Sequence, residues 1–107
     1  GNDDMVVPMM ALGAEGVISV AANILPEMVA QMANSYLAGD HATSLDTQLR
    51  LMPVICALFN EVSPIPCKAA MEMMGLCSGE LRLPLVPISD CNRAKLRDAL
   101  ISVGVAL

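Results

Sequence analysis

The sequence predicts a mostly α-helical chain with one short strand. Its apolar residues recur mostly three or four positions apart, as along one face of an α-helix. The exception is GVISV at residues 16–20, a β-branched run typical of a strand that is buried on both faces. Hydrophobic residues make up 55% of the 107 residues, and a domain of this size buries only about two-thirds of its surface. We therefore expect another part of a larger chain, or another subunit, to cover the remaining apolar surface.

The first predicted helix begins at two acidic residues and ends at Gly13. Asp3 and Asp4 suit its first turn, because carboxylates accept hydrogen bonds from the free backbone N–H groups there. A catalytic carboxylate pair at these two positions is the alternative, and we favour the capping role. Pro8 removes one backbone bond, so a bend is expected there.

Two longer helices follow the strand. Pro26 suits the first turn of one helix, which ends before Gly39. A second helix follows Asp40, with Pro53 as an expected kink. Its apolar stripe is predicted to pack in the core and consists of Leu45, Leu49, Met52, Cys56 and Phe59.

The last third of the chain predicts two more helices joined by an irregular segment. Pro66 begins a methionine-rich helix that ends near Gly75. The stretch ELRLPLVPIS at residues 80–89 is expected to be extended, because a residue that precedes proline avoids the α region. Ser89 can then cap a helix whose apolar positions are Leu96, Leu100 and Val103.

Composition excludes several classes of function. The net charge of −5 and the scarcity of aromatic residues argue against a nucleic-acid partner. No apolar run approaches the roughly 20 residues of a membrane-spanning helix, and no secretory leader is expected at the start.

His41 and the cysteines are too scattered for a zinc site, so neither a metal nor a cofactor is predicted. The cysteines are predicted to be buried, reduced thiols of a cytoplasmic protein, at Cys56, Cys67, Cys77 and Cys91.

The stretch SPIPCK places Lys68 in an apolar setting, where a lysine can act as a Schiff-base nucleophile. No general base is marked out around it. Pro66 at a first helical position instead predicts an ordinary helix start. We therefore assign no catalytic residue to this chain.

Five stretches in order resemble the C-terminal third of the dihydrodipicolinate synthase (4-hydroxy-tetrahydrodipicolinate synthase) family, within the pyruvate-dependent class I aldolases. They are GNDD at 1–4, ALGAEGVISVAAN at 11–23, RLMPVICALF at 50–59, EVSPIPCK at 61–68 and LRLPLVPIS at 81–89. The resemblance implies the end of a (β/α)8 TIM barrel followed by a C-terminal helical domain. Residues 1–39 would hold helix seven, strand eight and helix eight of the barrel, and residues 40–107 the helical domain.

The resemblance also implies a lyase of lysine biosynthesis that condenses pyruvate with aspartate semialdehyde. The lysine that forms the Schiff base would lie before Gly1, so this chain alone is expected to be inactive. Gly1 and Ile18 match positions whose backbone lines the pyruvate pocket, at the C-terminal ends of strands seven and eight. Leu12 matches a contact between dimers in the family's homotetramers, and we expect a homo-oligomer.

This chain departs from the family pattern at Asn2, Ala21 and Ser63, where aspartate, threonine and asparagine are usual. Two alternatives remain open at this point. One is a sibling lyase similar to N-acetylneuraminate lyase, whose specificity residues would lie mostly upstream. The other is an independent helical module that self-associates through its methionine-rich faces.

Overall fold

The computed structural model describes residues 1–107, and all of its regular secondary structure is helical. This confirms the mostly α-helical prediction. Two short 3-10 helices are η1 (Asp3–Met5) and η2 (Ala21–Asn23). The α-helices are α1 (Val6–Ala11), α2 (Pro26–Leu37), α3 (His41–Leu58), α4 (Ile65–Met73) and α5 (Asp90–Ser102). No helix is long and apolar enough to cross a membrane.

The chain forms two compact units, whose border falls inside α3. Unit 1 comprises Gly1–Ile55 and unit 2 comprises Cys56–Leu107. The predicted border between barrel and helical domain after residue 39 concerns the architecture of a longer protein, and it stays a prediction.

The predicted strand at residues 16–20 is not formed. This segment has no regular secondary structure between α1 and η2. A strand exists only through its backbone bonds to a neighbouring strand, and the 107 residues contain no second strand. The β-branched pattern was therefore insufficient to form a strand in this chain.

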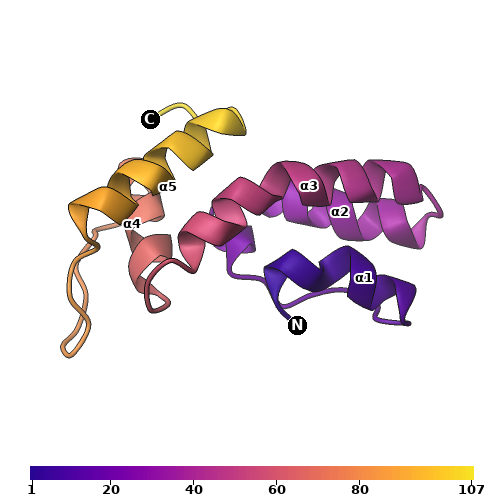
Figure 1. Cartoon of the computed structure of the whole chain (residues 1–107), viewed down its shortest axis with the longest axis horizontal. Coiled ribbons are helices and arrows are strands. Elements are labelled where there is room, and N and C mark those ends of the chain that lie inside the picture. Colours follow the sequence, from indigo (N-terminus) through magenta and orange to yellow (C-terminus); the bar gives the residue numbers. More distant parts are fainter. The chain divides into compact units, whose positions relative to one another are not determined.

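Unit 1 is built around a helical hairpin of α2 and the first part of α3, which lie side by side in Figure 1. The chain reverses at Gly39, whose φ of +85° lies in the left-handed region that glycine adopts without strain. Inside the hairpin, the Ser44 hydroxyl donates a 2.7 Å hydrogen bond to the Met32 carbonyl. The apolar core of unit 1 consists of Val6, Met10, Ala21, Ile24, Val29, Met32, Leu51, Val54 and Ile55.

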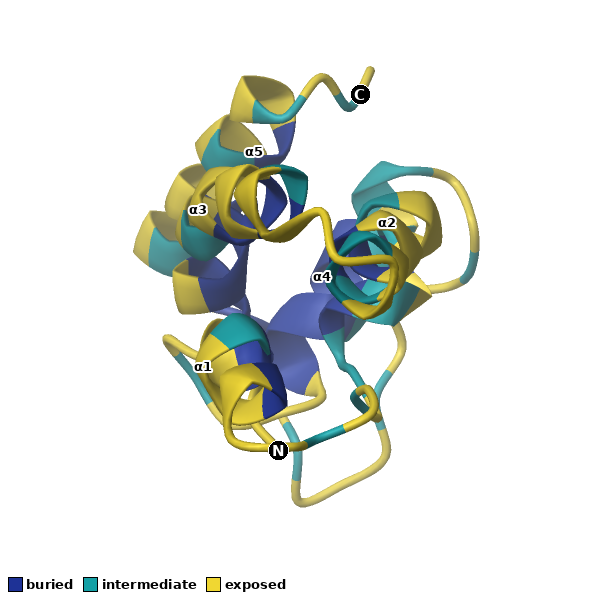
Figure 2. Ribbon diagram, turned by 90° about the vertical axis from the view of Figure 1, so that its right-hand side faces the viewer, coloured by how far each residue is buried: buried dark blue, intermediate teal, exposed yellow.

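The predicted buried face of α3 is wrong. Leu45, Leu49 and Phe59 are 49%, 60% and 49% exposed, and Cys56 is exposed too. A neighbouring stripe, offset by about 100° around the helix, is buried instead, and Figure 2 shows helices whose buried and exposed residues lie on different sides. That stripe has helical spacing but is polar in its first half, which is why apolar periodicity missed it. Its members are Ser44, Thr47, Gln48, Leu51, Val54, Ile55 and Leu58.

Unit 2 packs α4 against α5. Leu96 and Leu100 of α5 are fully buried, as predicted, and so is Ala70 of α4. Gly75, with a φ of +71°, follows the end of α4 close to the predicted position. The irregular segment between the two helices projects away from both as a long loop (Figure 1). Ile88 is buried, whereas the other apolar side chains of the segment are half-buried or exposed, and Leu83 is 87% exposed.

None of the cysteines forms a disulfide, and they are not all buried. Cys67 is buried in α4, whereas Cys56 and Cys91 are exposed and Cys77 is half-buried. The prediction of buried thiols is therefore wrong for the two exposed residues, which lie on helix faces that this chain does not cover.

Candidate functional site

The Asp3 carboxylate joins two segments of unit 1 that carry the predicted pocket residues. Its Oδ2 accepts hydrogen bonds from the backbone N–H groups of Val20 at 3.0 Å and Ala21 at 3.1 Å. The side chain is only 3% exposed. Asp3 therefore caps the start of η2 and not its own helix, where Asn2 is the capping position and no side chain caps. The sequence prediction was right about capping chemistry and wrong about its target.

Gln48 of α3 secures the same region from the other side. Its side-chain N–H donates to the Asp3 carbonyl at 2.9 Å, and its Oε1 accepts from the Val7 N–H at 3.2 Å. Gln48 is 4% exposed, so the N–H and the oxygen of its side-chain amide both bond to backbone atoms away from water. Sequence analysis missed this residue. Its spacing from Leu51 and Ile55, at three and seven positions, was the available signal.

The structure places the two predicted pocket residues next to the ends of this network. Gly1 lies two positions before Asp3, and Ile18 lies two positions before Val20. The Ile18 side chain is 98% exposed, and Leu12, the predicted contact residue, is 85% exposed. These values leave both side chains free to be covered by other protein surface. The pocket and contact roles themselves stay predictions.

Two carboxylates that accept hydrogen bonds from residues at the start of a helix have lowered pKa values. Asp40 accepts a 3.0 Å bond from the Thr43 N–H at the start of α3, and bonds from Thr43 hold the pKa of Asp40 below its ordinary value. In unit 2, Oε1 of Glu61 accepts from the Ser89 hydroxyl at 2.6 Å, the Ser89 N–H at 3.1 Å and Asn92 at 2.8 Å. These bonds, that of the Ser89 hydroxyl first, lower the pKa of Glu61. Ser89 occupies the capping position of α5, but its side chain binds Glu61 and caps no backbone group.

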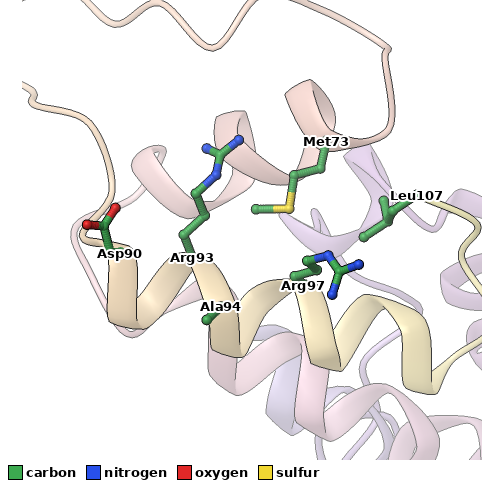
Figure 3. Close-up of a pocket in the computed structure, with 6 residues that line it drawn as sticks. All are labelled: Met73, Asp90, Arg93, Ala94, Arg97 and Leu107. Carbon is green, nitrogen blue, oxygen red and sulfur yellow. The ribbon is translucent and has the colours of Figure 1, made fainter.

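A cavity of about 540 Å³ lies between α4 and α5 of unit 2. Figure 3 shows Arg93 and Met73 pointing into it and the Arg97 guanidinium beside Leu107. Arg93 is already paired with Glu72 at 3.0 Å, and both side chains are 43% exposed. The cavity is lined by two arginines and one carboxylate, Asp90, and by no serine, cysteine, histidine or lysine, so it shows no pair of nucleophile and base.

Lys68 is half-buried in the second turn of α4, and its backbone N–H bonds to the Pro64 carbonyl. No carboxylate or hydroxyl bonds to its side chain, so the local geometry supplies no base for nucleophilic attack. No group of three or more His, Cys, Asp or Glu side chains could hold a metal ion.

Comparison with known proteins gives one consistent family. The profile of the dihydrodipicolinate synthetase family matches residues 1–103. A 4-hydroxy-tetrahydrodipicolinate synthase from Methanosarcina mazei is 50% identical over 105 residues, which are 98% of this chain and 36% of that protein. A synthase of the same name from Thermoanaerobacter sp. is also 50% identical over 105 residues and is covered to 35%.

Solved structures agree with these relatives. Dihydrodipicolinate synthase from Thermotoga maritima superposes with a TM-score of 0.97 at 40% identity, over 99% of this chain and 36% of that one. The chloride-inhibited synthase from Acinetobacter baumannii was solved in complex with pyruvate. It superposes with a TM-score of 0.93 at 36% identity, over 99% of this chain and 36% of that one. The chain thus spans about a third of the length of the proteins that it matches.

Proposed function

Because this chain belongs to the dihydrodipicolinate synthetase family, we propose that it forms the C-terminal third of a 4-hydroxy-tetrahydrodipicolinate synthase. The observation that carries the proposal is the 50% identity to the Methanosarcina mazei synthase along 98% of this chain. In this proposal, residues 1–39 complete a TIM barrel and residues 40–107 form the helical domain that follows it.

The proposed reaction is the condensation of pyruvate with aspartate semialdehyde through a lysine Schiff base, in lysine biosynthesis. The Schiff-base lysine and the proton-transfer groups belong to the upstream two-thirds of the synthase. Gly1 and Ile18 contribute backbone to the pyruvate pocket, in keeping with the rule that barrel sites lie at the C-terminal ends of strands. The pyruvate complex of the Acinetobacter baumannii relative supports this choice of substrate.

Exposed apolar side chains support a larger assembly. Ile18, Leu12 and Leu83 are 98%, 85% and 87% exposed in this chain. Burying such a side chain fully is worth about 1.5–3 kcal/mol, so surfaces of the upstream barrel and of a second subunit would gain by covering them. We assign Leu12 to a contact between subunits of a homo-oligomer. The cysteines form no disulfide, which favours a cytoplasmic enzyme.

The test is borohydride trapping on a full-length synthase that contains this sequence. Incubation with pyruvate and borohydride should attach one reduced pyruvate per chain, and peptide mapping should place it outside residues 1–107. The Lys68→Arg variant, as a control, should trap as much as the wild type. Trapping on Lys68 or Lys95, or no trapping at all, would disprove the proposal. Turnover with aspartate semialdehyde then separates the synthase from sibling lyases.

A further inference from the structure

The Asp3 carboxylate has one oxygen that this chain does not use. Oδ2 accepts two backbone hydrogen bonds, whereas Oδ1 is fully covered and has no hydrogen-bond partner. Buried polar atoms in folded proteins are almost always hydrogen-bonded, because burial without a partner carries the whole desolvation penalty. Only Oδ2 therefore connects the Asp3 side chain to the rest of the chain.

The bonds to Oδ2 restrain the segment that carries Ile18. This segment has no strand neighbour within the 107 residues, so its position depends on its two ends. At the C-terminal end, Asp3 holds the N–H groups of Val20 and Ala21. The Ser19 hydroxyl tightens the same turn by accepting a 2.9 Å bond from the Ala22 N–H. The backbone at Ile18 thus lies two residues from a fixed point.

Asp3 itself is held from α3 and not only by its own helix. The bond from Gln48 to the Asp3 carbonyl fixes the main chain from which the carboxylate projects. The Gly1 end of the pocket and the Ile18 end are consequently tied to one side chain. A carboxylate suits this task because hydrogen bonds to an ionised acceptor are stronger than those to a neutral one.

We propose that Asp3 is a positioning residue of the pyruvate pocket. Oδ2 holds the turn after Ile18 through the backbone N–H groups of Val20 and Ala21. This inference rests on the proposed function, and it adds a residue that contacts neither pyruvate nor the Schiff-base lysine.

Two substitutions in the full-length synthase test the bonds of Oδ2. D3A removes the acceptor, whereas D3N keeps one neutral oxygen for the Val20 and Ala21 N–H groups. D4N is the matched control, because Asp4 is the exposed neighbour. The readouts are the KM for pyruvate, kcat per trapped site, and amide hydrogen exchange of the peptide that covers residues 16–24.

D3A is expected to raise the KM for pyruvate about tenfold and to speed exchange in this peptide, since two charge-assisted bonds are lost. D3N should keep KM within about twofold of wild type, yet exchange faster than D4N at residues 16–24, because a neutral oxygen accepts more weakly than a carboxylate. An unchanged KM in D3A would overturn the positioning role, because KM does not depend on how many sites fold. A D3N variant that exchanges no faster than D4N would overturn the restraint by Oδ2.

These outcomes remain separable from the proposed function. If the wild-type protein traps no pyruvate, the proposed function fails and the pocket role of Asp3 fails with it. Amide exchange does not depend on activity, so faster exchange of residues 16–24 in D3A and D3N than in D4N would still support the restraint by Oδ2. If D3A does not fold, the exchange of D3N against D4N decides the case.

Discussion

The two compact units bury different kinds of side chain. In unit 1 the core contains four polar residues, Asp3, Ser44, Thr47 and Gln48, beside its apolar ones. In unit 2 every buried residue is apolar or the small thiol Cys67. The hydrogen bonds of Glu61 and the ion pair of Arg93 with Glu72 lie nearer the surface. Unit 1 therefore uses buried hydrogen bonds where unit 2 uses apolar packing.

This difference has a physical meaning for the proposed pocket. Apolar packing is strong but tolerant of small shifts, whereas a buried hydrogen bond forms only within a narrow range of distance and direction. The segment with Ile18 lacks strand partners in this chain, and the polar network of unit 1 gives it defined positions instead. Directional bonds are found where a segment must be placed, and apolar burial where helices need only be held together.

The largest effect is expected from Leu96→Ala in unit 2. Leu96 is fully buried, so its truncation should lower the free energy of unfolding by about 2–5 kcal/mol through lost burial and a cavity. Urea unfolding of the full-length synthase measures it. Lys95→Ala, on the exposed side of the same helix, is the control and should change stability little. Equal losses for both would mean that unit 2 does not depend on its apolar core.

Gln48→Leu tests the polar core of unit 1. The substitution strands the Asp3 carbonyl and the Val7 N–H away from water, which should lower the free energy of unfolding by about 1–3 kcal/mol. Gln31→Leu on the exposed face of α2 makes the same chemical change as a control. If Gln48→Leu were as stable as that control, the buried bonds would not matter to unit 1.

A smaller, pH-dependent effect is expected from Glu61→Gln. Bonds from Ser89 and Asn92 lower the pKa of Glu61 below its ordinary 4.5 in the folded state. Its stabilisation should therefore be complete above pH 4.5 and be lost as the pH falls through the folded pKa. The Tm difference between wild type and Glu61→Gln should shrink between pH 7 and pH 3. The control Glu80→Gln, on the exposed loop, should melt like the wild type at both pH values.

The smallest effect is expected from Glu72→Gln, which breaks the ion pair with Arg93. Both partners are 43% exposed, so water and salt screen the pair, and the loss should stay within about 1 kcal/mol. Added salt should remove most of the difference in Tm from wild type. A loss as large as that of Gln48→Leu would contradict the contrast between the two units.

Local chemistry could be predicted from the sequence where neighbours along the chain decide it. Pro26 begins α2 and Gly39 follows its end, and Leu96 and Leu100 are buried in α5. Each depends on backbone restriction or on helical spacing, which a reader of the sequence sees directly. The family also followed from five short stretches.

Partners distant in the chain could not be predicted in this way. The carboxylate of Asp3 could cap any free N–H group, and only the fold brings it to Val20 and Ala21, 17 and 18 positions away. Likewise α3 carries two stripes with helical spacing, and its sequence favoured the more apolar one. Folding buried the other, because its polar members Ser44 and Gln48 find backbone partners inside unit 1.

The sequence by itself determined the helices, their ends and the family, because these depend on residue types at fixed short spacings. Only the tertiary structure decided which helix face is buried, which N–H groups Asp3 binds, and that the β-branched run at 16–20 forms no strand here. These outcomes depend on which surfaces meet. A hydrogen bond or a buried face needs a partner, and its identity is a property of the folded arrangement and not of the residue alone.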